Sequence, residues 1–168
     1  MTYEARSHGR GQALVEFALI LPVLILILLA IFDVGRLVYA YNAVSNAARE
    51  GGRTAIVNQT PATVRERAAQ QATALGLPST DPGGCPANGD PTAAAASGIC
   101  FVLLNDAGTA PCNPPAVGCT AVVSVKWKYQ TLVPLVGNIV GPISVTSTTR
   151  QAIESLCAND VPKPCPVR

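Results

Sequence analysis

An uninterrupted apolar run near the N-terminus constrains this chain more than any other feature. Residues 17–32 (FALILPVLILILLAIF) contain no charged side chain, and extending the run back to Gln12 adds only one, Glu16. About 20 apolar residues at a rise of roughly 1.5 Å each cross a hydrocarbon core of about 30 Å. The run therefore predicts a transmembrane helix over residues 12–32, and the absence of a second such run predicts a single crossing.

Composition and cysteine placement indicate on which side of a membrane the body lies. Charged residues make up 13% of the chain, about half the share of an ordinary soluble domain, and hydrophobic residues 49%. All six cysteines follow the apolar run, and disulfides persist in oxidising compartments. We expect a single-pass protein of the cell membrane with a cytoplasmic leader over 1–11, which carries Arg6 and Arg10, and an extracytoplasmic head over 33–168.

The same features argue against two other classes of protein. A secreted protein released by signal peptidase is one alternative, but the apolar run is longer than the roughly 7–15 residues of a signal sequence and passes directly into helical sequence. The net charge of +2 provides no basic stripe, so no nucleic-acid partner is expected. A retained membrane anchor is favoured.

One carboxylate lies inside the apolar run, and it needs an explanation. An ionisable group at mid-bilayer costs about 2.5–3.5 kcal/mol on insertion scales, and less near the edge. If the chain were cut after Gly11, the new N-terminus at Gln12 would lie about 6 Å from Glu16 along a helix axis. A neighbouring subunit's terminal ammonium could then pair with Glu16 and set the axial register. Taken singly, Glu16 could instead reach the headgroups and Gly11 could be a turn residue.

The order of these residues resembles a known family. A basic leader, Gly11, four residues and then Glu16-Phe17 resemble the processing site of type IV pilin-like proteins, most closely the Flp/Tad variant. Residues 10–56 resemble the TadE-like family, including Ala48-Arg49-Glu50-Gly51-Gly52-Arg53, and residues 120–155 resemble it more weakly.

This resemblance implies a pseudopilin, or minor pilin, with a processing site at Gly11, Gln12, Glu16 and Phe17. It implies cleavage after Gly11 by a prepilin peptidase, followed by incorporation into or beneath an extracellular Flp/Tad pilus. The implied partners are membrane lipid, the prepilin peptidase, other pilin-like subunits and the Tad secretion apparatus. The alternative is an uncleaved single-pass anchor whose head is an extracytoplasmic binding module.

The head combines helical and strand patterns. Apolar residues at three- and four-residue steps predict that the helix extends over 33–50 and ends at Gly51-Gly52, with Asp33 and Arg36 paired on its outer face. Thr60-Pro61 predicts the start of a short helix over 60–75. A small, antiparallel β-sheet is expected within about 99–155, with strands over 99–104, 121–129 and 143–149. Residues 78–98 and 105–118 are expected to be loops.

The predicted fold class is therefore α+β and pilin-like: a long N-terminal transmembrane and spine helix packed on a small antiparallel sheet, with disulfide-braced loops. In the strand over 121–129, the alternation places Trp127 and its odd-numbered neighbours towards the core. The outward set is Ser124, Lys126 and Lys128.

The cysteines favour disulfides over a metal site. Six cysteines allow 15 pairings, and short loops favour Cys112 with Cys119 and Cys157 with Cys165, which leaves Cys85 with Cys100. Zinc is the alternative, but there is no Cys-x-x-Cys pair and the only histidine, His8, lies in the leader. Without a histidine in the head, neither a Ser-His-Asp nor a Cys-His arrangement can form there, so we expect no enzyme, no cofactor and no metal.

Overall fold

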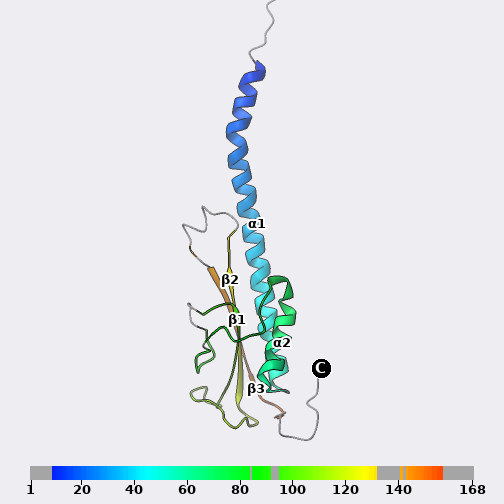
Figure 1. The fold of residues 1–168 in the computed structure, drawn as a ribbon, viewed down its shortest axis with the longest axis vertical. Coiled ribbons are helices and arrows are strands. Elements are labelled where there is room, and N and C mark those ends of the chain that lie inside the picture. Colours follow the sequence, from blue (N-terminus) through cyan, green and yellow to red (C-terminus); the bar gives the residue numbers. More distant parts are fainter. Residues whose placement is uncertain (1–8, 84, 92–94, 132–140, 142, 157–168) are drawn as a thin grey trace, which may run out of the picture.

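A computed structural model describes residues 9–83, 85–91, 95–131, 141 and 143–156. One long helix, α1 (Gly9–Ala55), forms the axis of the molecule. Its N-terminal half extends away from the rest of the protein, and its C-terminal half is flanked by a second helix and a sheet (Figure 1). The remaining elements are α2 (Pro61–Gln71), a 3-10 turn (Thr73–Leu75), β1 (Gly98–Leu104), β2 (Thr120–Tyr129) and β3 (Ile143–Ala152). The expected fold class is confirmed.

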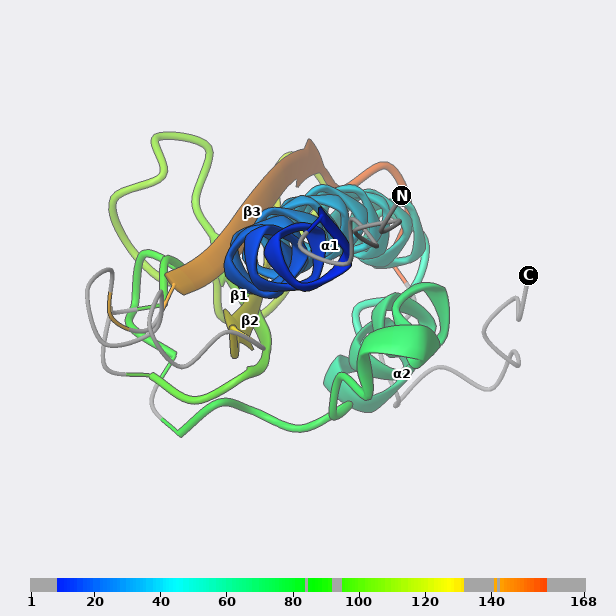
Figure 2. The same cartoon turned by 90° about the horizontal axis from the view of Figure 1, so that it is seen from above.

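The three strands form an antiparallel sheet in the order β1-β2-β3. Its register places Cys100 opposite Ser124 and Val123 opposite Thr149. Side chains alternate between the two faces along a strand, so the odd-numbered residues of these strands share one face and the even-numbered residues share the other. Seen along the long axis, α1 lies against the sheet with α2 beside it (Figure 2).

The odd-numbered face packs on α1 through small side chains. The buried residues of the C-terminal half of α1 are mostly alanines, and α2 adds Val64 and Ala68 to the same core. Small residues allow the helix backbone to approach the sheet closely, and Val123 and Val125 fill the space from β2. The buried hydrophobic residues of α1 are Ala40, Ala43, Val44, Ala47, Ala48 and Ala55.

The expected helix end at Gly51-Gly52 was wrong, because α1 continues to Ala55. Both glycines are buried. A Cβ atom on Gly51 would lie 2.8 Å from Val123 Cγ1 and 3.1 Å from Ala68 Cβ, and one on Gly52 would lie 2.8 Å from Thr149 Cγ2. Glycine is therefore required here for the close approach of helix and sheet, and it does not terminate the helix.

The even-numbered face is also covered, by the loop between α2 and β1. Gly89 of this loop lies so close to the sheet that a Cβ atom would be 2.8 Å from both Val102 and Val122. Asp90 accepts hydrogen bonds from Thr148 Oγ1 at 3.1 Å and from Arg150 at 3.4 Å. The loop thus forms a third layer on the sheet, although its sequence indicates only turns.

This third layer corrects the expectation for β2. Ser124 is fully buried and Lys126 is only 1% exposed, so β2 is covered on both faces and Lys126 does not point into solvent. Burial lowers the pKa of Lys126, and the charge of Lys128 lowers it further. Lys128 is exposed as expected.

Two disulfides brace the loops, as the fold class anticipated. Cys85–Cys100 joins the covering loop to β1, with 5.4 Å between Cα atoms, and Cys112–Cys119 closes the loop between β1 and β2 at 6.2 Å. Cys157 and Cys165 lie outside the described residues.

The second helix follows directly on α1. Pro61 occupies its first turn, and the backbone N–H of Thr60 donates to Asn58 Oδ1 at 2.9 Å. The sequence predicted helix over 60–75; the structure has α2 to Gln71, then the 3-10 turn, which ends where Gly76 adopts φ +62°. That left-handed conformation favours glycine and reverses the chain.

Candidate processing and assembly site

We call residues 11–32 of α1 the bare segment, because the head does not cover them. Every residue from Gly11 to Phe32 is exposed, including large side chains such as Leu19 and Phe32, each 71% exposed. Within the described residues this is one helix long and apolar enough to cross a membrane, judged by length and composition. It continues through Pro22, which lacks the backbone N–H donor of other residues. The first buried residue is Asp33.

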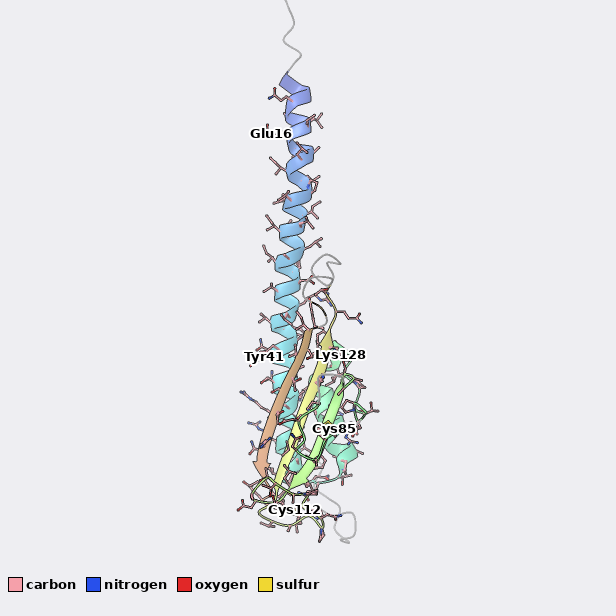
Figure 3. All side chains as sticks on the ribbon, turned by 90° about the vertical axis from the view of Figure 1, so that its left-hand side faces the viewer. Glu16, Tyr41, Cys85, Cys112 and Lys128 are labelled. Atoms are coloured by element: carbon pink, nitrogen blue, oxygen red, sulfur yellow. A yellow bond between two sulfur atoms is a disulfide. The ribbon has the colours of Figure 1, made fainter. Side chains whose placement is uncertain are left out.

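The predicted processing residues lie together at the far end of this bare segment. The helix already begins at Gly9, so the Gly11–Gln12 peptide bond lies in its first turns. A Cβ atom on Gly11 would meet nothing within 4 Å, and Phe17 is 59% exposed. Figure 3 shows Glu16 near the tip of the rod, distant from the head. All four positions are therefore left uncovered by the head, and Gln12 and Glu16, four residues apart, share one face of the helix.

Glu16 is exposed and makes no hydrogen bond or ion pair with any residue that the structure describes. Of the residues three and four positions away on the helix, Ala13, Leu19 and Ile20 are aliphatic, and the fourth is Gln12. A carboxylate in this setting is available to a group from outside the chain.

A buried hydrogen-bonded contact between Tyr129 and Asp33, which we call the clasp, joins the head to α1 where the bare segment ends. The Tyr129 hydroxyl lies 2.8 Å from Asp33 Oδ1 and 3.1 Å from the Asp33 carbonyl oxygen, and both oxygens accept hydrogen bonds from it. The Arg36 guanidinium lies over the Tyr129 ring, 5.7 Å from its centroid. Burial raises the pKa of Tyr129, the hydrogen bond and charge of Asp33 raise it further, and Arg36 opposes them.

This clasp replaces the expected pair of Asp33 with Arg36 on the outer face. Asp33 instead points inward, to the sheet. The sequence did contain a signal, because Asp33 precedes Leu37 by four residues and Ala40 by seven, a spacing that places all three on one helix face.

Trp127 supports the same junction. Its indole Nε1 donates to the Leu75 carbonyl at 3.1 Å, and its ring centroid lies 5.7 Å from that of Tyr129. The indole packs against the core, as expected. The 3-10 turn after α2 is thereby attached to the end of β2.

The Ala48–Arg53 motif has two sides. Its glycines face the sheet, whereas Arg49, Glu50 and Arg53 line a polar groove of about 630 Å³ together with residues of α2 and β3. The other lining residues are Asn46, Gln71, Thr148, Thr149 and Gln151. Among the residues that the structure describes, no group of three His, Cys, Asp or Glu side chains is placed to hold a metal ion.

Comparison with known protein families identifies part of the chain. Residues 11–53 match the family model described as TadE-like protein, a span that begins at the predicted cleavage position and covers nearly all of α1. No curated protein and no solved structure matches the chain significantly. The bare apolar helix, the exposed Glu16 and the glycine contacts of α1 all lie within the matched residues. The chain thus carries a TadE-like domain over residues 11–53, which includes the N-terminal apolar helix.

Proposed function

We propose that this protein is a non-enzymatic structural subunit for Flp/Tad pilus assembly, processed after Gly11. In this proposal residues 1–11 are a cytoplasmic leader that a prepilin peptidase removes. Residues 12–32 cross the membrane once, and residues 33–168 form the extracytoplasmic head. The TadE-like family implies an association with the Tad pilus apparatus.

The observation that carries this proposal is the unpaired carboxylate of Glu16 on the bare apolar helix. Cleavage after Gly11 would create an ammonium group at Gln12, four residues away. In its own helix this ammonium lies about 6 Å up the axis. A neighbouring subunit displaced along the axis by about that distance would bring its ammonium beside Glu16, and an ion pair in low dielectric is strong.

The bare aliphatic surface supports the same mechanism. A helix that leaves lipid must keep its apolar side chains away from water, and a bundle of similar helices provides that environment. Large side chains give such a bundle contact area without specifying one axial register. A single charged pair supplies the register, because every other alignment leaves a charge unpaired in an apolar medium.

The first experiment is to determine the N-terminal sequence and intact, non-reduced mass of the protein recovered from native membranes. We expect a terminus at Gln12. In Gly11→Leu the leader should be retained, whereas Gly35→Ala, which adds a methyl group to the same helix where nothing lies within 4 Å, should be processed normally. A terminus at Met1 in the unmodified protein would contradict the proposal and favour an uncleaved anchor whose head is a binding module.

The register function of Glu16 has its own test. Glu16→Ala should insert into the membrane and be processed, yet fail to be incorporated into assembled pili. Glu66→Ala is the matched control, because it removes one exposed carboxylate from α2 in the head. Normal incorporation of Glu16→Ala would exclude the charged register.

A further inference from the structure

Apolar and aromatic side chains continue to be exposed on α1 beyond the expected membrane span. Val34 is 61% exposed, Val38 and Tyr39 are each 55% exposed, and Tyr41 is 59% exposed. We call these four residues, with Arg36 of α1 and Lys128 of β2, the collar. An extracytoplasmic helix surface in water normally carries polar residues at such positions.

An apolar groove of about 440 Å³ adjoins the collar. It lies between α1 and the beginning of β3, at the end of the head from which the bare helix emerges. Figure 3 places Tyr41 and Lys128 at a similar height along the long axis, on different sides of the head. The groove is lined by Leu37, Val38, Tyr41, Ile143, Ser144, Val145 and Thr146.

The collar begins within the headgroup layer of a bilayer and extends beyond it. A span of about 20 residues ending at Phe32 fills the hydrocarbon core, and each headgroup layer adds roughly 5–8 Å. At about 1.5 Å per residue, Val34 lies about 3 Å and Val38 about 9 Å beyond Phe32. Tyr39 and Tyr41 lie about 10–14 Å beyond it, and helical side chains point back towards the N-terminus, which brings their rings closer to the membrane. Tyrosine is enriched at this depth in membrane proteins.

The exposed charge at this end of the head is positive. Asp33 is buried and its Oδ1 accepts a hydrogen bond from the Tyr129 hydroxyl, and α1 has no other acidic residue between Phe17 and Arg49. The chain carries no charged residue from Gln130 to Thr149. Arg36 and Lys128 are exposed cations at this end of the head. Each cation near an anionic lipid surface contributes attraction equivalent to about a fivefold enrichment of that lipid.

The angular distribution of the collar favours lipid over a second helix. Each residue turns the helix by about 100°, so Val34, Val38 and Tyr41 lie within one narrow sector, whereas Tyr39 lies about 100–160° away from them. A second helix would cover one stripe, but a lipid surface contacts the helix on every side that the head leaves open.

We propose that the collar and the adjoining groove bind the phospholipid surface of the extracytoplasmic leaflet and select anionic headgroups. The inference rests on the membrane anchoring in the proposed function, but not on leader cleavage or pilus assembly. The head is thereby seated directly on the membrane, without a spacer between the bilayer and the sheet.

Depth-dependent quenching tests the seating. We would reconstitute full-length protein into vesicles of equal parts phosphatidylglycerol and phosphatidylcholine, with bromines on the acyl chains either near the headgroup or near the chain ends. Tyr41→Trp in a Trp127→Phe background should be quenched more strongly by bromines near the headgroup. Arg49→Trp in that background, about 12 Å further along α1, should not be quenched.

Phe32→Trp in the same background separates this inference from the proposed function. Quenching at position 32 without quenching at position 41 would preserve the anchor and overturn the seating. No quenching at either position would overturn both. Quenching at position 41 that disappears as the protein-to-lipid ratio rises would show that a second copy covers the collar, and would also overturn the proposal.

Lipid selection is tested without altering Trp127, which serves as energy donor to dansyl-labelled phosphatidylglycerol or phosphatidylcholine. The protein should transfer more energy to the phosphatidylglycerol probe, with enrichment of up to about fivefold per cation. Arg36→Gln with Lys128→Gln should abolish the preference, whereas Arg49→Gln with Arg53→Gln, which removes the same charge further from the membrane, should retain it. Equal transfer to the two probes in the unmodified protein would exclude selection of anionic lipid.

Discussion

The two faces of the sheet are buried by different means. The odd-numbered face meets α1 and α2, where alanines, Gly51 and Gly52 allow two regular elements to pack closely. The even-numbered face meets an irregular loop, which is held by the Cys85–Cys100 disulfide, by Gly89 and by the contacts of Asp90.

The difference shows two ways of covering a small sheet. Helices supply continuous apolar area, and hydrophobic burial alone can hold them against a strand. A loop rich in proline and glycine supplies little such area, so it depends on a covalent link and on specific polar contacts. We therefore expect substitutions on the two faces to act by different mechanisms.

The largest effect on stability is expected on the even-numbered face, which the loop covers and which we call the loop face. Replacing Cys85 and Cys100 together by serine removes a link across 15 residues and should lower the free energy of unfolding by about 3 kcal/mol. Denaturant unfolding in detergent measures this loss of stability. The Cys112→Ser with Cys119→Ser variant, whose link spans only 7 residues, should lose about 2 kcal/mol. If the Cys85 and Cys100 variant were as stable as the unmodified protein, the loop would not depend on its crosslink.

On the helix face, Gly51→Ala should destabilise the protein by about 2 kcal/mol, because the added methyl group collides with Val123 and Ala68. Gly35→Ala in the bare part of the same helix meets no atom, and should be neutral or stabilising by about 0.5–1 kcal/mol. Thermal unfolding of both variants under one condition gives the comparison. Equal responses would mean that the helix and sheet are less closely packed than the structure indicates.

Removing the hydrogen bonds of the clasp should have a smaller effect on the free energy of unfolding. Tyr129→Phe leaves the buried Asp33 carboxylate without its hydroxyl donor and should cost about 1.5 kcal/mol at neutral pH. Tyr41→Phe removes an exposed hydroxyl and serves as the matched control.

The pH dependence of this effect follows from the raised pKa of Tyr129. The folded protein retains the phenolic proton above the ordinary pKa of 10.0, so the stabilisation is complete below about pH 10 and is lost as the pH rises through the folded-state pKa. The stability difference between the unmodified protein and Tyr129→Phe should therefore shrink above pH 10. A constant difference up to strongly alkaline pH would contradict this assignment.

The smallest effect is expected from the ion pair on the loop face. Arg150 and Asp90 are 3.4 Å apart, and their side chains are 53% and 51% exposed. Such a pair contributes little, so Arg150→Gln should change the free energy of unfolding by less than about 0.5 kcal/mol. A loss comparable to that of the disulfide variant would show that the loop is held mainly by charge.

Local patterns in the sequence predicted the elements well. The apolar run, the alternation along β2 and the Thr60-Pro61 start are each readable within a few residues. The errors occurred where a distant contact decides the outcome. The local sequence at Gly51-Gly52 predicts a helix end, and only the close contact with the sheet explains why the helix continues. The alternation along β2 predicts that Lys126 faces solvent. The loop buries it instead, and no short-range pattern in the loop sequence predicts that contact.

In the candidate site, too, the local pattern was predictable from the sequence and the distant contact was not. The order of Gly11, Glu16 and Phe17 is a local pattern, and it was accessible from the sequence together with the family resemblance. The inward position of Asp33 was accessible only in part, through its spacing from Leu37 and Ala40. Its partner Tyr129 lies 96 residues away, and no periodicity in one segment can identify a contact over that separation.

The continuity of α1 makes the orientation of the head a function of residue count. Because the clasp at Asp33 fixes the head to the helix, adding one residue between Phe17 and Asp33 would rotate the head by about 100° around the axis and move it by about 1.5 Å relative to Glu16. Adding seven would restore its orientation to within about 20°. In the proposed assembly, the length of the bare segment would therefore set the rotation of the head as well as its distance from Glu16, and it would determine which side of the head a neighbouring subunit meets.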